Sequence, residues 1–191
     1  QIAKGVTNAD GDATVSVLPK VGGKAPGMLR MMLTTRVFEP SGEFSVDSRM
    51  TTFSPYARYA GVKSPQAGPK PLETDKRHSF SVVSVSPDGQ PQAGVKLNVS
   101  IYKTGWWWWW SATEQMADFR SSEYTTPVKT VKLTTGADGK ADFQDLVFHN
   151  DWGSYFISVS DPGSGHAAGL MSYFDWPGMT GRSADGSADA T

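Results

Sequence analysis

The residues with the most evident chemical potential are five consecutive tryptophans, Trp106, Trp107, Trp108, Trp109 and Trp110, in a chain that contains seven. Indole rings stack on sugars, lie at membrane interfaces and anchor protein contacts. On a strand, alternate rings of the run would point to opposite faces, so both faces need a cover if all five are to be buried. We favour packing within the protein or against a neighbouring domain over glycan stacking, and glycan stacking over membrane contact.

The other reactive residue types show no catalytic or metal-binding pattern. The three histidines, His78, His149 and His166, lack the spacing of metal ligands, and there is no cysteine. Residues Asn8–Asp12 resemble the start of a calcium loop but lack its distal glutamate, so we interpret them as a turn. No nucleophile elbow, phosphate-binding loop or dinucleotide fingerprint occurs. The sequence therefore predicts a protein that is not an enzyme and uses no metal or other cofactor.

Charge and hydropathy limit the remaining functional classes to which the protein could belong. Lys plus Arg number 18 and Asp plus Glu number 19, which argues against a nucleic-acid binder with its basic face. No apolar run is long enough to span a membrane, and neither a signal peptide nor an initiator methionine begins the chain. The tail 181–191 has the composition of a linker. We interpret the chain as a segment cut from a longer one.

The elements that must position these residues are strands. Polar and apolar residues alternate, as in half-buried strands, over residues 12–18, 29–38, 44–47, 78–85, 95–103, 127–133, 141–148, 153–160 and 166–176. Gly136–Lys140 predicts a hairpin turn with glycine where φ is positive. The one helical candidate is 112–121. In the later part of the chain, roughly seven strands in about 120 residues, with turn signals at regular spacing, predict an antiparallel, immunoglobulin-like β-sandwich.

A change in composition divides the chain near residue 60. Proline and glycine are frequent between Ser54 and Pro69, and long apolar runs are few. We therefore predict two β-sandwich modules in tandem, over residues 1–60 and 61–191. The second carries the tryptophan-rich extension and the C-terminal linker, and the completeness of the first stays open.

Several motifs of the second module resemble those of bacterial alpha-2-macroglobulins. They are Pro87–Leu97, Tyr102–Gly105 with the tryptophan run, the segment 127–140, and the group Asp151–Tyr155, Asp161–His166 and Phe174–Gly178. Residues 1–60 resemble the module before it more weakly, through Val37–Gly42 and Ser54–Val62. The resemblance covers most of this chain but only a middle piece of a family member.

This resemblance implies two consecutive macroglobulin-like domains of a periplasmic, envelope-anchored protease trap. In the family, a protease cuts a bait region, the molecule rearranges, and a thioester made from Cys and Gln captures the attacker. Since this chain has no cysteine and no identifiable bait region, the implied role is a scaffold that contacts neighbouring macroglobulin-like domains. Target proteases would be engaged by the full-length protein, and the membrane would be reached only through an anchor outside this segment.

The resemblance suggests a structural hypothesis for the tryptophans. We expect Trp106–Trp110 to pack with Trp152, Tyr155 and Trp176 at an interdomain contact, because each such ring removes about 150–250 Å² from water. The alternative is a carbohydrate-binding or adhesin-type β-sandwich that uses an exposed tryptophan cluster.

Overall fold

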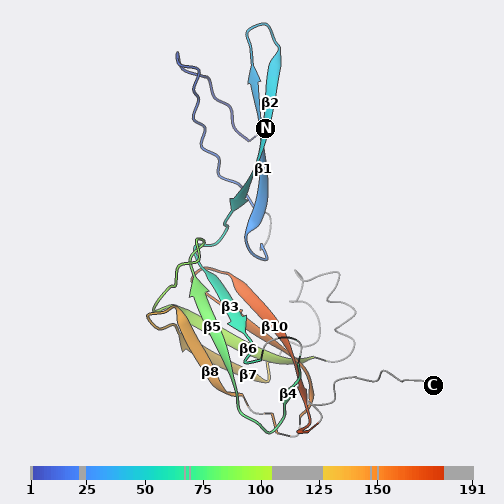
Figure 1. The fold of residues 1–191 in the computed structure, drawn as a ribbon. Coiled ribbons are helices and arrows are strands. Elements are labelled where there is room, and N and C mark those ends of the chain that lie inside the picture. Colours follow the sequence, from blue (N-terminus) through green and yellow to red (C-terminus); the bar gives the residue numbers. More distant parts are fainter. Residues whose placement is uncertain are drawn as a thin grey trace, which may run out of the picture.

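The computed structural model describes residues 2–21, 25–66, 68, 70–104, 127–146, 148–149 and 151–178. Within these residues the regular structure consists of ten β-strands and no helix (Figure 1). The prediction of an all-β fold is therefore confirmed. The strands are β1 (Leu29–Phe38), β2 (Phe44–Phe53), β3 (Tyr59–Lys63), β4 (Leu72–Glu73), β5 (His78–Val85), β6 (Lys96–Thr104), β7 (Lys129–Thr134), β8 (Lys140–Leu146), β9 (Gly153–Ser160) and β10 (Ala167–Asp175).

Eight of these strands form two sheets. The larger sheet has the order β4-β10-β9-β6-β7, and the smaller has the order β3-β5-β8. Neighbouring strands are antiparallel, except that the short β4 lies parallel to β10. The two sheets enclose one core, as expected for a macroglobulin-type β-sandwich.

The core follows from the period of two in the sequence. Alternate residues of β5, β6 and β9 point inward, and the exposed fraction of these side chains is 0–1%. They are Phe80 and Val82 on β5, Leu97, Val99 and Ile101 on β6, and Tyr155, Ile157 and Val159 on β9. Each fully buried apolar side chain of this size contributes about 1.5–3 kcal/mol to folding. The predicted strands 78–85 and 153–160 match β5 and β9 residue for residue.

Two predictions of local structure are wrong. Residues 12–18 alternate but form no strand, because Val15 and Leu18, which are 43% and 89% exposed, find no sheet to cover. Gly136–Lys140 does form a turn, with Gly139 at a φ of 71°, but it is not a hairpin. Because β7 pairs with β6 while β8 pairs with β5, this turn carries the chain from one sheet to the other.

The remaining strands, β1 and β2, form a separate hairpin that projects from the sandwich (Figure 1). Its register runs from Leu29 opposite Phe53 to Phe38 opposite Phe44. Residues 29–53 thus form a two-stranded sheet here, and the assignment of residues 1–60 to a complete or incomplete β-sandwich module stays a prediction. Strand β3 crosses the predicted boundary at residue 60 and pairs with β5.

Thr135 ties together two loops at the end of the sandwich where β6 begins. Its hydroxyl donates to the Gln92 carbonyl at 2.6 Å and accepts from the Val95 N–H at 2.9 Å. Its carbonyl accepts from the Gly94 N–H at 2.8 Å, and its side chain is buried. The loop 87–95 and the turn 135–140, which the sequence presented as separate motifs, are therefore one hydrogen-bonded unit.

We predict that Thr135→Val destabilises the sandwich by about 1–3 kcal/mol, because it leaves a partly buried N–H and a partly buried carbonyl without their partner while preserving shape. Urea unfolding followed by circular dichroism measures this change. Thr134→Val, at the exposed neighbouring position, is the matched control and should shift stability by less than about 0.5 kcal/mol. Equal stability of the two variants would contradict the role assigned to the Thr135 hydroxyl.

Candidate functional site: the aromatic end and the hairpin joint

The structure gives partial information on the residues predicted to form a contact surface. Trp106–Trp110 and the helical candidate 112–121 lie outside the described residues. Trp152 and Trp176 are partly exposed, at 48% and 38%, whereas Tyr155 is fully buried. Of the predicted set, two described side chains therefore reach the surface and one belongs to the core.

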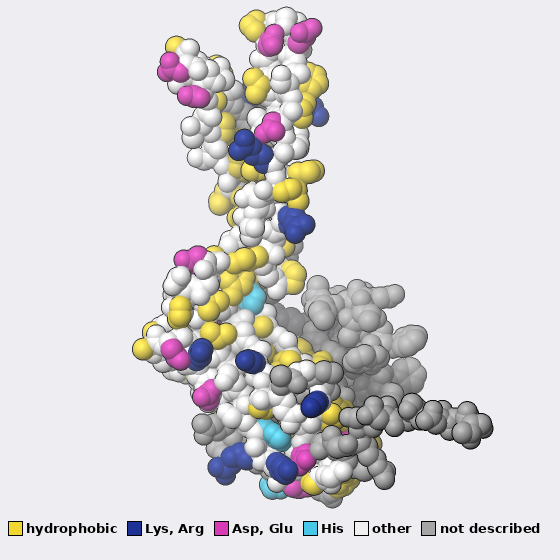
Figure 2. Space-filling model, in the orientation of Figure 1, with side chains coloured by type: hydrophobic (Ala, Val, Ile, Leu, Met, Phe, Trp, Pro, Cys, Tyr) yellow, Lys and Arg dark blue, Asp and Glu magenta, His cyan; other side chains and the backbone are white. Residues whose placement is uncertain are grey.

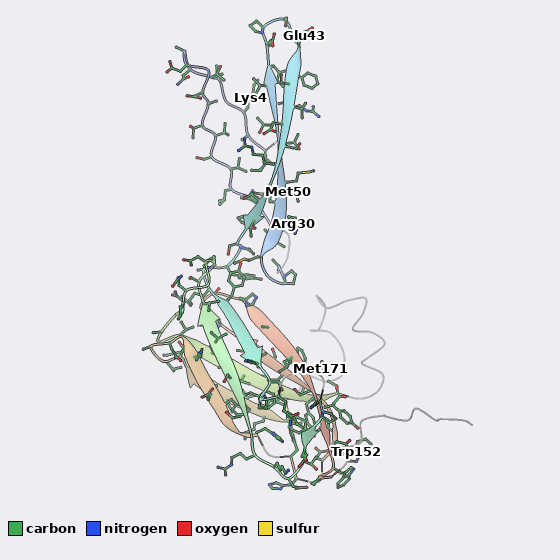
Figure 3. All side chains as sticks on the ribbon, viewed as in Figure 1. Lys4, Arg30, Glu43, Met50, Trp152 and Met171 are labelled. Atoms are coloured by element: carbon green, nitrogen blue, oxygen red, sulfur yellow. The ribbon has the colours of Figure 1, made fainter. Side chains whose placement is uncertain are left out.

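Trp152 and Trp176 lie at the same end of the larger sheet. Trp152 directly precedes β9, Trp176 directly follows β10, and Gly153 is paired with Phe174 in the ladder between them. Thr104, the last residue of β6, is paired with Ser154 at the same end. This end, marked by Trp152 in Figure 3, lies opposite the hairpin tip near Glu43. We call it the aromatic end.

Tyr155 anchors the aromatic end from inside. Its ring stacks on Phe148 with centroids 3.8 Å apart and meets Phe174 edge-on at 5.3 Å. Its hydroxyl donates to the Asp151 carbonyl at 3.1 Å. Burial, reinforced by Asp151, raises the pKa of the Tyr155 phenol, so the hydroxyl stays neutral.

Asp151 links this core residue to β6 through an ion pair with Lys103. The hydrogen bond from Lys103 lowers the pKa of the Asp151 carboxyl. Both side chains are nearly half exposed, so the pair is screened by water and contributes little stability. The pair nevertheless connects the start of β9 to the end of β6. In the sequence, the tryptophan run follows the end of β6.

A second site, at the other end of the sandwich, was not predicted. It is the joint between the hairpin and the sandwich. It consists of residues 54–60, residues 25–26, which precede β1, and the loop 161–166 between β9 and β10. Asp161 lies at its centre with 2% exposure, and it accepts hydrogen bonds from Arg58 Nε at 2.9 Å and from the Gly163 N–H at 2.8 Å. Ser164 donates its hydroxyl to the Arg58 carbonyl at 2.6 Å.

The charge of Asp161 is stabilised by these donors. Burial alone would raise the pKa of the Asp161 carboxyl, but hydrogen bonds from Arg58, Ser164 and Gly163 outweigh burial and hold the pKa below its usual value. The carboxylate is therefore ionised, and its oxygens accept hydrogen bonds from Arg58, Gly163 and Ser164. Such an ion pair holds one geometry, and that geometry positions the segment before β3 against the loop after β9.

His166 forms the other half of the joint. Its Nδ1 accepts a hydrogen bond from the Ala60 N–H at 3.1 Å, and its exposed fraction is 6%. The rings of Tyr56 and Tyr59 meet it edge-to-face, with centroids 5.1 and 4.8 Å from that of the imidazole. Tyr56 in turn donates its hydroxyl to the Ala25 carbonyl at 2.6 Å. Burial lowers the pKa of His166, which favours the neutral ring.

An apolar cleft of about 350 Å³ lies beside the joint. Its lining comes from the N-terminal segment, the hairpin base and the loop after β9, and consists of Pro19, Val21, Ala25, Phe53, Pro55, Tyr56 and Gly165. Among the described residues, the lining of this cleft carries no charged side chain.

The sequence signals for the joint were incomplete. The loop 161–166 was visible as a Pro/Gly turn and as part of a family motif, but its partners are about a hundred residues earlier in the chain. Nothing in the local pattern around Arg58 indicates an ion pair, since a lone arginine in a Pro/Gly-rich segment is ordinarily solvent-exposed.

The described residues show no arrangement for metal chemistry, since no group of three His, Asp or Glu side chains converges among them. No helix in the described part of the chain is long and apolar enough to cross a membrane.

The sequence of the sandwich matches a known domain family. A family model described as bacterial macroglobulin domain 6 matches residues 61–176. The chain belongs to the bacterial alpha-2-macroglobulin family. The matched residues run from within β3 to the residue after β10, so they comprise almost the whole sandwich of this macroglobulin domain and exclude the hairpin.

Solved structures of the family resemble the chain at low identity. The crystal structure of Salmonella alpha-2-macroglobulin reacted with methylamine is similar with a TM-score of 0.50 and 15% identity, over 82% of this chain and 11% of that one. The cryo-EM structure of E. coli alpha-2-macroglobulin in its native conformation has a TM-score of 0.47 and 14% identity, over 78% and 10%. The similarity to the Salmonella protein shows the fold alone. The search of curated proteins found no match. The chain spans about a tenth of the length of these two structures.

We predict that Asp161→Ala destabilises this chain by about 2–4 kcal/mol, because it leaves Arg58 and the N–H groups of Gly163 and Ser164, which are only partly buried, without their acceptor. This value is below the usual cost of breaking a buried pair, because Arg58 is 31% exposed. Asp47→Ala, which removes the exposed partner of Arg49, is the control and should be neutral. Since the folded pKa of Asp161 is lowered, its contribution is complete above pH 3.8 and is lost as the pH falls through that lowered pKa. An equal effect of both variants at pH 7 would refute the central role of Asp161.

Proposed function

We propose that this chain is a non-catalytic scaffold segment of a periplasmic, envelope-anchored protease trap of the alpha-2-macroglobulin type. The observation that carries the proposal is the match of residues 61–176 to bacterial macroglobulin domain 6 on a sandwich filled by its own side chains. Neither the aromatic end nor the joint pairs a nucleophile with a base among the described residues, which supports a mechanical role. The segment would transmit contacts between neighbouring domains, while the full-length protein engages the target protease.

The hairpin supports the existence of such a neighbour. Near its tip the two faces differ. One face carries Met32, Phe38, Phe44, Val46 and Met50, all 52–66% exposed, beside Arg30 and Arg36, whereas the opposite face carries Thr35, Ser45 and Asp47 beside one exposed apolar residue, Val37. Figure 2 shows hydrophobic side chains along this arm. An isolated two-stranded hairpin is marginally stable in water at best. We therefore propose that residues 1–60 belong to an adjoining β module of the parent protein, which covers the apolar face.

The aromatic end supports a second interdomain contact. Trp152 and Trp176 are partly exposed at the edge where β6 ends, and the chain continues from Thr104 through Gly105 into Trp106. We propose that Trp106–Trp110 join Trp152 and Trp176 in a contact with another domain, above a core sealed by Tyr155. Glycan binding by the same indoles is the alternative, and binding of the isolated chain to a glycan array that Trp152→Ala abolishes would favour it.

The trap hypothesis predicts a particular response of the full-length parent to trypsin. We expect limited cleavage, a mobility shift on native gels, and trypsin that still hydrolyses a small chromogenic peptide but loses activity on a large protein substrate. Pre-inactivated trypsin is the control and should cause no shift. Progressive digestion, with trypsin equally active on both substrates, would contradict the protease trap.

The hairpin proposal predicts that Met50→Glu destabilises the full-length parent by about 2–3 kcal/mol, since a buried apolar side chain is replaced by a charge. Thr51→Glu, on the same strand but the opposite face, is the matched control and should be neutral. In this 191-residue chain alone both should be neutral, because Met50 is 59% exposed. Thermal unfolding of both proteins measures the difference. A neutral Met50→Glu in the parent would mean that the apolar face is not covered by a neighbouring module.

A further inference from the structure

The hairpin carries positive charge on the same face as its exposed apolar side chains. Arg30, Met32 and Arg36 share one face of β1, because even numbers of residues separate them. Met50 of β2 lies opposite Met32 in the ladder and so belongs to the same face. Both arginines are exposed, and Figure 2 shows dark blue and yellow side chains together along this arm. We call this surface, with the five apolar side chains assigned to it above, the cationic face.

The acidic residues of the hairpin lie elsewhere. They are Glu39, Glu43 and Asp47. Asp47 lies on the opposite face, where it pairs with Arg49 at 3.3 Å. Glu39 and Glu43 close the turn at the tip, which Glu43 marks in Figure 3, and the Glu39 N–H donates to the Glu43 carbonyl at 2.8 Å. Among the described residues, no carboxylate forms an ion pair with either arginine of the cationic face.

Arg36 lies against the apolar part of this face. Its guanidinium carbon is 5.7 Å from the centroid of the Phe44 ring, over which it lies. The ring offers no oxygen acceptor, so the N–H donors of the guanidinium need one wherever a neighbour removes water from them. A carboxylate meets this need best, because it accepts two parallel hydrogen bonds from the edge of the guanidinium.

The two arginines restrict what can cover the methionines between them. Met32 and Met50 form one step of the ladder, with Arg30 two residues away toward the base and Arg36 four residues away toward the tip. These steps correspond to roughly 7 and 13 Å along the strand. Figure 3 shows Arg30 and Met50 in the same part of the hairpin. A surface that buries the two methionines therefore meets a cation on each side, and a wholly apolar surface would leave both cations without a partner.

An anionic membrane also combines apolar material with negative charge, but the tip of the hairpin disfavours it. Phe38 and Phe44 form an aromatic pair at the tip, with ring centroids 5.2 Å apart. Glu39 and Glu43 directly adjoin these rings in the sequence, and the negative surface of such a membrane would repel their carboxylates. A protein surface can instead place its acidic groups opposite the arginines and away from the tip.

We propose that the cationic face docks onto a β surface of the parent protein that is both apolar and acidic, with carboxylates opposite Arg30 and Arg36. The carboxylate opposite Arg36 accepts two hydrogen bonds from the guanidinium that lies over Phe44. Met32 and Met50 pack against apolar side chains between the two ion pairs. This inference rests on the proposal above that an adjoining module covers the hairpin, and it adds the chemistry by which that module recognises the hairpin.

Hydrogen–deuterium exchange of the full-length parent, followed on peptides from residues 29–53, tests this inference. We expect Arg36→Gln to lower the protection of the hairpin amides about tenfold or more, because a charge-assisted pair of hydrogen bonds is lost. Arg49→Gln, which removes the same charge from the opposite face, is the matched control and should lower protection by less than about threefold. Equal losses in the two variants would show a general effect of charge and overturn the inference.

A second variant separates this inference from the proposal on which it rests. If Met50→Glu lowers the protection and Arg36→Gln does not, a module covers the face without carboxylates, so the inference is wrong and the covering module stands. If neither variant lowers it, the covering module is also wrong.

The 191-residue chain alone shows whether the effect of Arg36 comes from a partner. In this chain Arg36 is exposed, so Arg36→Gln should lower hairpin protection by less than about fivefold, through loss of the contact with Phe44. A loss as large as in the parent would assign the whole effect to that contact and overturn the inference.

Vesicle flotation at low ionic strength tests the membrane as the partner. We expect the 191-residue chain to stay unbound to vesicles of phosphatidylcholine and phosphatidylglycerol. Flotation that Arg36→Gln abolishes would assign the cationic face to an anionic lipid surface and overturn the inference.

Discussion

The structure depends on one constraint: the alternating side chains of β5, β6 and β9 must be removed from water between two sheets. The residues that meet there, such as Phe80, Ile101 and Ile157, are large and fully buried. Their burial fixes the register of these strands in the two sheets of the sandwich, because a slip by one residue would turn these side chains toward solvent. The loops at both ends of the sandwich are thereby held in fixed positions. The packing of the core therefore determines the geometry of the aromatic end and of the joint.

The hairpin lacks this constraint. Residues on β1 and β2 alternate as well, yet among the described residues no second sheet covers them, and side chains such as Met32 and Phe38 remain exposed. At the joint, hydrogen bonds and an ion pair act together with the ring contacts of Tyr56 and Tyr59 on His166. Asp161 and His166 form directional contacts, which define an angle between two bodies, whereas apolar contacts mainly define proximity.

The sequence predicted what alternation alone controls, which is the all-β class and the positions of strands such as β5 and β9. The predictions from the sequence failed where the pairing of strands determines the structure. Gly139 correctly indicated a positive φ, but the partner of β8 is β5 and not the adjacent β7, which no local signal reveals. Similarly, the short strand β4 exists only because β10 offers it an edge. The joint was missed for the same reason, since Arg58 and Asp161 are distant in sequence and neither belongs to a catalytic pattern.

The two ends of the sandwich differ in chemistry, and that difference bears on how such a segment can act in a longer protein. At the aromatic end, Tyr155 and its neighbours form a rigid apolar base whose strength does not depend on protonation near neutral pH. At the joint, hydrogen bonds of Asp161, Ser164 and His166 connect the loop after β9 to the segment that leads from the hairpin into β3. If this domain is a scaffold segment, as we propose, apolar packing at one end and directional polar contacts at the other would hold its two neighbouring parts in different ways, by proximity at the first and by orientation at the second.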